Sequence, residues 1–338
     1  MNVQTIPPVP GMIDLACSRH GAKVCSASDD FFAEKENLIK ESAPIFLADK
    51  YTENGKWMDG WESRRKRDKG HDWCIIKLAY EGQIHSADID TSFFRGNHPP
   101  FASVMACESD NEPGPDSPLW EEIIPQCSLK EHSGNLFAVT PRLKPRFEKY
   151  NYIKLNIFPD GGVARLRIYG TIPENPKALS GQKGVNLFDF SKGASAVCCS
   201  DAFFSPMQNL LLPDMPAHMG EGWETRRKRH PGHDWVILKA ACPGILTKIS
   251  ISTKFFKGNF PDRFSLESCF LGTANTDQLL NQENLWKPLL NETPMIADSW
   301  HEYEKELRHQ DPVSHIRLNI YPDGGIARFR GFGDPIDL

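Results

Sequence analysis

The sequence lacks the features of a membrane or secreted protein. It contains no apolar run of about 18 residues, the length that a membrane-spanning helix needs. Residues 1–16 have neither the cationic start nor the apolar stretch of a signal peptide. Nine cysteines are scattered without a Cys-x-x-Cys pair, which favours a reduced protein over a disulfide or zinc framework. We therefore expect a cytoplasmic protein with no membrane partner. The ending Ile336-Asp337-Leu338 matches a Ser-Lys-Leu address poorly, and a peroxisomal location is left open.

An excess of positive charge and the common nucleotide motifs are missing as well. The net charge is −5 and the isoelectric point is about 6.1, so no nucleic-acid partner is expected. The chain has no Walker loop, no Rossmann fingerprint and no Gly-x-Ser-x-Gly elbow. With 40% hydrophobic and 25% charged residues, its 338 residues suit a globular protein with two domains of ordinary size.

What the sequence does contain is a long internal repeat. The run Gly-Trp-Glu-(Ser/Thr)-Arg-Arg-Lys-Arg at 60–67 returns at 222–229, and Gly-His-Asp-Trp at 70–73 returns at 232–235. About half of the positions are identical between 59–107 and 221–269. A repeat of this length indicates two copies of one folding unit. A duplicated polar cluster also requires an explanation beyond core packing.

The secondary-structure signals are mostly those of short strands. Two runs rich in aromatic and β-branched residues predict strands at 73–78 and 235–239. Two runs in which apolar and polar residues alternate predict strands at 154–158 and 165–169. The Asp-Gly-Gly sequences at 160–162 and 323–325 are typical of hairpin turns between such strands. Helix signals are few, at 298–307 and more weakly at 31–39.

These signals predict an all-β fold with a β-sandwich or jelly roll in each copy. We place the first repeat at 1–170 and the second at 188–338. A linker marked by proline and glycine spans 171–187. Cys107 and Cys269 occupy equivalent positions and read as small buried hydrophobes.

The basic run and the His-Asp pairs are the strongest candidates for chemistry. A loop arginine such as Arg65 can bind a carboxylate in bidentate fashion, although an internal ion-pair lattice of Glu62, Arg65 and Asp72 explains the same residues. His71-Asp72 suggests general acid–base chemistry, but adjacent strand residues point to opposite faces and need not form a dyad. No cluster has the spacing of a committed metal site.

Taken together, the two sets of motifs closely resemble the allantoicase family over nearly the whole chain. The shared motifs include Thr-x-Phe-Phe-x-Gly-Asn and Asn-Ile-(Phe/Tyr)-Pro-Asp-Gly-Gly-(Val/Ile)-Ala-Arg, which occur once in each copy. The resemblance implies two tandem jelly-roll domains of the galactose-binding-like type and assembly into a homo-oligomer. It also implies a hydrolase acting on a linear amidine-type C–N bond, which converts the small molecule allantoate and water into ureidoglycolate and urea.

Hydrolysis of that substrate requires three kinds of group. Guanidinium groups would hold its carboxylate, and the candidates are Arg65, Arg165, Arg227 and Arg328. A histidine would protonate the leaving nitrogen, and the candidates are His71 and His233. A carboxylate would activate water or orient the histidine, and the candidates are Glu62, Asp72, Glu224 and Asp234. The sequence requires no cofactor; a divalent metal could assist the reaction, but no residue pattern supports one.

Two further hypotheses remain open at this point. The rival to an enzyme is a non-catalytic tandem jelly-roll protein that binds sugars or another ligand, because sandwich folds host many functions. The copies also differ, since Asp88 and Asp90 of the first are replaced by Ser250 and Ser252 in the second. A single active site could therefore be built unequally from the two halves.

Overall fold

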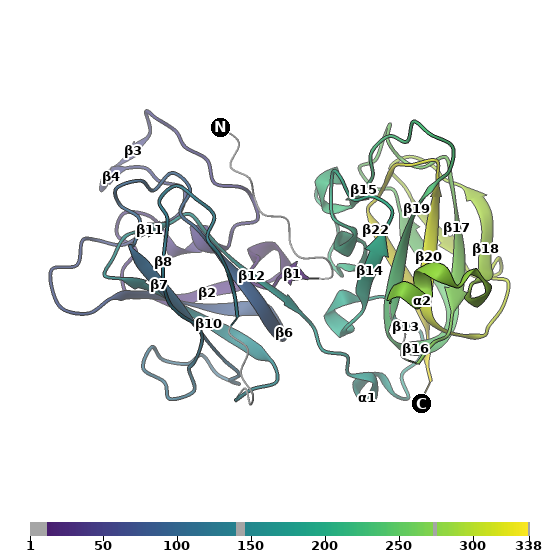
Figure 1. Cartoon of the computed structure of the whole chain (residues 1–338), viewed down its shortest axis with the longest axis horizontal. Helices are drawn as coiled ribbons and strands as arrows, with labels where there is room; N and C mark the ends of the chain where they lie inside the picture. The colour runs from purple at the N-terminus through teal and green to yellow at the C-terminus, as the bar shows by residue number, and fades with distance from the viewer. Residues whose placement is uncertain (1–11, 140–145, 273–275, 337–338) are drawn as a thin grey trace. The chain divides into compact units, whose positions relative to one another are not determined.

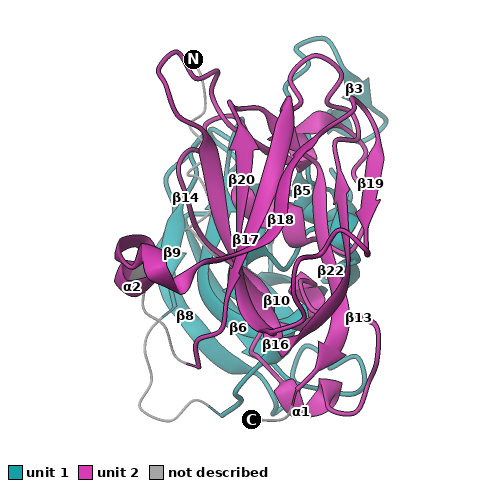
Figure 2. Ribbon diagram, turned by 90° about the vertical axis from the view of Figure 1, so that its right-hand side faces the viewer, with its two compact units in different colours: residues 1–171 teal, residues 172–338 magenta. Residues whose placement is uncertain are grey.

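The chain folds into two compact units, residues 1–171 and 172–338 (Figures 1 and 2). The computed structural model describes residues 12–139, 146–272 and 276–336. Strands dominate both units, and the described part has only two short α-helices. None of the helices in these residues is long and apolar enough to cross a membrane.

Unit 1 is a two-layer sandwich built around one long strand. Its strands are β1 (Ile13–Asp14), β2 (Lys23–Ala27), β3 (Tyr51–Thr52), β4 (Gly55–Lys56), β5 (Trp61–Glu62), β6 (Asp72–Asp90), β7 (Phe101–Cys107), β8 (Glu121–Ser128), β9 (Leu136–Ala138), β10 (Tyr150–Phe158), β11 (Gly162–Val163) and β12 (Arg165–Thr171). The order is β1-β12-β6-β10-β7-β8, with β2 and β9 also paired to β6. Short 3-10 helices lie at Ser18–His20 and Lys35–Ile39.

Unit 2 repeats this arrangement. Its strands are β13 (Val185–Asn186), β14 (Ser195–Cys199), β15 (Trp223–Glu224), β16 (Asp234–Ser252), β17 (Arg263–Cys269), β18 (Lys287–Pro294), β19 (Trp300–Tyr303), β20 (Pro312–Tyr321), β21 (Gly325–Ile326) and β22 (Arg328–Pro335). The order is β13-β22-β16-β20-β17-β18, with β14 and β19 paired to β16. Its helices are α1 (Pro176–Leu179) and α2 (Thr276–Asn281), and 3-10 turns lie at Phe190–Lys192, Met207–Leu211, Met219–Glu221 and Glu283–Leu285.

The 19-residue strands β6 and β16 each belong to both layers of their unit. The first part of β6 pairs with β2 and β10, whereas its last part pairs with β9 and β12. Every pairing is antiparallel, and the inward faces alternate with outward ones as an amphipathic sandwich requires. The prediction of an all-β fold with two sandwich domains is confirmed.

The repeated tryptophans and cysteines are part of the core. Trp61 and Trp223 are completely buried, and their indole nitrogens donate to the carbonyl oxygens of Asp29 and Asp201 at 2.7 and 2.8 Å. Cys107 and Cys269 are also buried, as predicted. A ring that must bury its polar N–H needs such a partner, so both tryptophans fix the loops that precede them.

Two local predictions are wrong. Residues 298–307 do not form a helix, because 300–303 form β19 and pair with the last part of β16. Cross-strand pairing outweighs the weak helical preference of the segment, and Asp298 has a positive φ of 50°. The segment 31–39 contains only the 3-10 turn at its end.

The Asp-Gly-Gly turns do not close hairpins. The flanking strands β10 and β12 are both neighbours of β6 and do not pair with each other. Instead, Gly162 and Val163 form β11, which pairs with β5. The local sequence signals a turn because Gly161 needs its φ of 138°, but it carries no information on which strands the turn connects.

Candidate active site

The duplicated basic loop lies between β5 and β6 in unit 1 and between β15 and β16 in unit 2. The buried carboxylate of Asp72 binds Lys66 Nζ at 2.6 Å and accepts from Ser28 Oγ at 2.8 Å. In unit 2, Asp234 binds Lys228 at 2.8 Å in the same way. Both predicted carboxylates are therefore engaged in holding the start of the long strand, where a buried ion pair is costly to break.

The predicted carboxylates Glu62 and Glu224 have asparagine partners. Glu62 Oε1 accepts from Asn97 Nδ2 at 2.8 Å, and Glu224 accepts from Asn259 in the equivalent position. Burial raises the pKa of the Glu62 carboxyl, and the hydrogen bond from Asn97 partly offsets that effect. A carboxyl group with a raised pKa is better matched to proton transfer near neutral pH than an ordinary carboxyl group is.

Arg65 and Arg227 are exposed, as are the other arginines of each loop. Their neighbours Arg64 and Arg226 pair with Asp29 at 2.6 Å and with Asp201 at 3.1 Å. Among the described residues, neither Arg65 nor Arg227 has a carboxylate partner. Of the predicted lattice of Glu62, Arg65 and Asp72, only Asp72 forms an ion pair, and its cation is Lys66.

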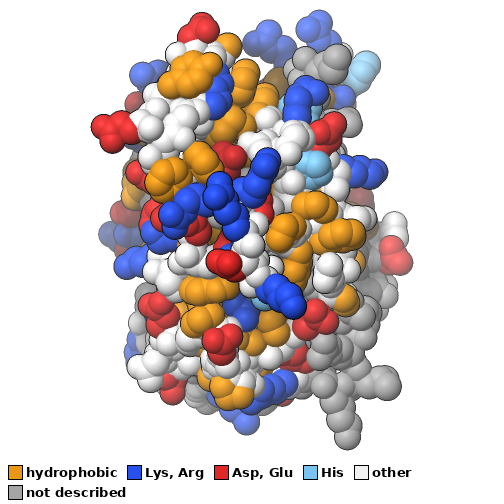
Figure 3. All heavy atoms as spheres, turned by 90° about the vertical axis from the view of Figure 1, so that its left-hand side faces the viewer, with side chains coloured by type: hydrophobic (Ala, Val, Ile, Leu, Met, Phe, Trp, Pro, Cys, Tyr) orange, Lys and Arg blue, Asp and Glu red, His pale blue; other side chains and the backbone are white. Residues whose placement is uncertain are grey.

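An exposed arginine is not in itself a site, because such side chains are common on this protein. On the face drawn in Figure 3, lysine and arginine side chains gather among exposed hydrophobic ones. Arg65 and Arg227 therefore remain predictions as substrate ligands: their guanidinium groups are available for an anion, but neither residue lines a cavity described below.

Arg165 and Arg328 occupy a different environment from that expected of substrate ligands. Their side chains are only 1% and 0% exposed. Each guanidinium nitrogen of Arg165 donates within unit 1, including NH2 to Asp59 Oδ2 at 2.8 Å. Arg328 binds Asp214 at 3.2 Å and the Glu221 carbonyl oxygen at 2.6 Å. We assign both to the scaffold, because their donors are satisfied before any ligand arrives.

The histidines His71 and His233 each contact an asparagine on the neighbouring strand. His71 Nε2 lies 3.3 Å from Asn156 Oδ1, and His233 Nε2 lies 3.2 Å from Asn319 Oδ1. Neither imidazole pairs with the following aspartate in the described structure, so the predicted alternation of faces holds and no His-Asp dyad forms. Each ring is half-buried.

In unit 2, the histidine opens onto a cavity of about 450 Å³ on the outward face of β16, β17 and β20. Glu267 Oε2 accepts from Arg317 Nε at 2.6 Å and from Asn319 Nδ2 at 3.0 Å. His233, Asn319, Glu267 and Arg317 thus form one hydrogen-bonded chain along the wall. Although burial alone would raise it, the hydrogen bonds from Arg317 and Asn319 hold the pKa of Glu267 below its usual range.

Unit 1 does not reproduce this wall. Met105 and Lys154 are paired across β7 and β10 where Glu267 and Arg317 are paired across β17 and β20. Lys154 Nζ instead donates to the Pro115 carbonyl oxygen at 2.6 Å, and burial lowers its pKa. The two histidines are therefore equivalent in sequence and unequal in surroundings.

Sequence reasoning missed Glu267 and Arg317. The search followed residues that recur in both copies, and these two do not recur. Asn319 does recur, inside the motif shared with Asn156. At position 267 the second copy has a glutamate where the first has Met105, and this exchange of an apolar for a charged residue points to the same wall.

Comparison with known proteins agrees with the duplicated architecture. The family model described as allantoicase repeat matches residues 13–173 and 185–336. Similar relatives include a probable allantoicase 2 from Burkholderia mallei, 42% identical over 95% of this chain and 94% of its own length. A probable allantoicase from Photobacterium profundum is 44% identical over 95% of this chain and 96% of its own.

Solved structures give the same result. The crystal structure of allantoicase from Saccharomyces cerevisiae is similar with a TM-score of 0.77 and 35% identity, over 95% of this chain and 93% of that one. Another allantoicase structure has a TM-score of 0.77 and 33% identity, over 96% and 94%. With one allantoicase repeat in each unit, the chain belongs to the allantoicase family.

Proposed function

We propose that this chain hydrolyses allantoate to ureidoglycolate and urea, a step in the breakdown of purines through allantoin. The observation that carries the proposal is the match of the allantoicase repeat to both units, together with similarity to allantoicases along 95% of the chain. Because both repeats are present in order, the likeness concerns the whole enzyme and not a shared sandwich fold alone.

The chemistry of allantoate defines what a site must supply. One carbon carries a carboxylate and two ureido groups, and water replaces one ureido group while the C–N bond to it breaks. The leaving urea nitrogen gains a proton, and the attacking water loses one. A proton donor, a proton acceptor and a cation for the carboxylate are therefore needed close together.

We place this chemistry at the cavity beside His233. The imidazole would donate the proton to the leaving nitrogen, held in orientation by Asn319. The guanidinium of Arg317 would hold the substrate carboxylate with the donors that Glu267 leaves unused. The cavity volume of about 450 Å³ is ample for so small a substrate.

The proton acceptor is a carboxylate, and two glutamates of unit 2 are candidates. Glu224 keeps its role from the sequence as the candidate base, and the hydrogen bond from Asn259 orients its carboxylate. Glu267 is the alternative, because it lines the cavity, but its lowered pKa makes it a weaker base.

Urea release from allantoate by the purified chain tests the function directly. We expect urea and ureidoglycolate in equal amounts, measured by colorimetric urea assay and by chromatography. Parallel reactions with chelator and with added divalent ions decide whether a metal assists. Failure to release urea under every metal condition would overturn the proposal and favour a binding protein.

Assembly and location are also part of the proposal. We infer a cytoplasmic homo-oligomer from the family resemblance. Light scattering on the purified chain measures the mass in solution, and a mass equal to one 38.2 kDa chain would contradict the oligomer.

A further inference from the structure

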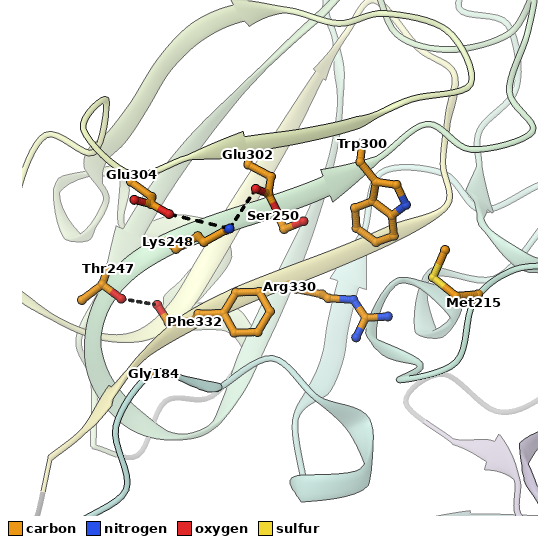
Figure 4. Close-up of a pocket in the computed structure, with 10 residues that line it drawn as sticks. All are labelled: Gly184, Met215, Thr247, Lys248, Ser250, Trp300, Glu302, Glu304, Arg330 and Phe332. Atoms are coloured by element: carbon orange, nitrogen blue, oxygen red, sulfur yellow. Dashed lines mark hydrogen bonds and ion pairs between the residues drawn. The ribbon is translucent and has the colours of Figure 1, made fainter.

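A second cavity in unit 2 lies away from the His233 site. It has a volume of about 660 Å³ and opens over the last part of β16, with β19 and β22 beside it (Figure 4). Its wall includes Ser250, Trp300, Arg330 and Phe332. None of its lining residues also lines the cavity beside His233. The two cavities use different parts of β16, and hence different layers of the sandwich.

The notable group in this cavity is the guanidinium of Arg330. It donates to the Pro213 carbonyl oxygen at 2.8 Å and lies 5.7 Å from the Trp300 ring. In the described part of the chain, no carboxylate pairs with it. The other cation of the cavity, Lys248, is bound by Glu302 at 2.8 Å. The second carboxylate of the wall, Glu304, also pairs with Lys248, at 3.6 Å, so both carboxylates of the cavity are directed to Lys248 and neither pairs with Arg330.

The equivalent arginine of unit 1 is neutralised. Arg167 binds Asp14 at 3.3 Å, and Asp88 is its direct partner across β6 and β12. In unit 2, Asn186 stands at the position of Asp14, and Ser250 stands opposite Arg330. The arginine has been kept while both carboxylates around it have been replaced by neutral residues.

Ser250 supplies a second donor at the same place. Its side chain is 4% exposed, and its hydroxyl has no hydrogen-bond partner among the residues described. Directly opposed residues of neighbouring strands have Cβ atoms about 5 Å apart, so the hydroxyl and the arginine can reach one ligand. Figure 4 shows Ser250, Trp300 and Arg330 facing the same space.

We propose that this cavity binds a small carboxylate compound with a planar or apolar body. Arg330 and Ser250 hold the carboxylate by charge-assisted hydrogen bonds. The rings of Trp300 and Phe332 cover the body of the ligand. The site goes beyond the proposed hydrolysis, because it is separate from His233 and exists only in the unit that has lost the neutralising carboxylates.

Benzoate and benzamide are suitable probes, because they differ in the carboxylate and share the ring. Ligand-observed NMR titrations of the full chain should show benzoate binding at least about tenfold more tightly than benzamide. Arg330→Gln should reduce the affinity for benzoate to that for benzamide. The matched variant Arg167→Gln in unit 1 should leave it unchanged.

A second variant changes the charge without removing the arginine. Ser250→Asp restores the carboxylate that unit 1 has at this position, and should weaken benzoate binding as strongly as Arg330→Gln does. Thermal melts establish that each variant is folded. Equal affinities for the two probes, or equal losses in Arg167→Gln and Arg330→Gln, would overturn the proposal.

His233→Asn separates this site from the proposed catalytic cavity. Benzoate affinity should be unaffected, and its loss would show that the probe occupies the other cavity. Because urea release is measured with allantoate alone, a wild-type chain without that activity would refute the proposed hydrolysis and leave the benzoate result standing.

Discussion

The imidazoles of His71 and His233 have the same kind of partner but different surroundings. Each Nε2 contacts an asparagine Oδ1, at 3.3 and 3.2 Å. Only His233 is joined through its asparagine to a carboxylate–guanidinium pair. A proton donor needs a bound and oriented substrate to act on, and unit 1 has no counterpart of that pair.

Separate replacement of the two histidines by asparagine should therefore have unequal effects. His233→Asn should lower kcat by about 10²–10⁴-fold, the usual contribution of a general acid, whereas His71→Asn should cost less than about tenfold. Steady-state urea release measures both, and unchanged melting temperatures exclude misfolding. A larger loss in His71→Asn would transfer the role to unit 1.

Asp88 carries a pH dependence of stability. Burial, with a contribution from the nearby Asp90, raises the pKa of Asp88 to about 6. An unfolded aspartate titrates near 3.9, so between these values the folded chain keeps a proton that the unfolded chain has lost. The contribution of this proton to the stability of the folded chain is complete below about pH 4 and is lost as the pH rises through 6.

Asp88→Asn should remove that dependence, because an amide stays neutral and its oxygen can still accept from the Asn135 amide. We expect the melting temperature to rise by a few degrees at pH 7.5 and to change little at pH 4. The exposed Asp110→Asn is the control. A lower melting temperature for Asp88→Asn at pH 7.5 would mean that the charged form stabilises the fold.

The candidate residues show how far single positions can be read from sequence. The sequence indicated that His71 need not pair with Asp72, and the two do not pair in the described structure. The His, Glu and Arg candidates remain predictions as substrate-binding and catalytic residues. Burial was not predictable. Arg65 and Arg165 both lie in repeated motifs, yet Arg65 is exposed, whereas Arg165 is buried and paired with Asp59. Whether a charge is buried depends on elements distant in the chain.

At the scale of elements, two glycines fix how the turn segments pack. A Cβ atom added to Gly162 would lie 1.9 Å from the buried ring of Phe94, and one added to Gly325 would lie 1.9 Å from Phe256. These glycines are required by the close approach of β11 and β21 to an aromatic ring. The Asp-Gly-Gly motif therefore owes its last residue to packing.

Gly162→Ala should destabilise unit 1 by about 1–3 kcal/mol, as is typical of overpacking in a core that cannot yield. Gly96→Ala serves as the control, because nothing lies within 4 Å of a Cβ atom added there. Urea denaturation curves of both variants measure the difference. Equal midpoints would show that the ring of Phe94 moves aside at little cost.

Element type was predicted better than element pairing. Strands at 73–78 and 235–239 fall within β6 and β16, as their aromatic and β-branched residues indicated. The segment 300–303 became a strand because β16 offers it an edge, and the 160–162 turn joins strands that are not neighbours. Both errors concern contacts between residues far apart in sequence, which local preference does not encode.

At the scale of the molecule, the repeat gave the architecture directly, since identity between the copies implies equal folds. It did not show how the surroundings of equivalent residues differ between the copies. That difference lies in paired exchanges, such as Met105 for Glu267 and Asp88 for Ser250. Each exchange becomes meaningful only when the register shows which residue stands opposite it.

The shared strands β6 and β16 have a consequence for how each unit opens. Because one continuous strand supplies hydrogen bonds to both layers, neither layer can separate without exposing backbone groups of the other. Each sandwich should therefore behave as a single cooperative block in amide hydrogen exchange, with the slowest amides located in the middle of these strands. Both cavities of unit 2 therefore lie on one rigid block, at different parts of the same strand β16.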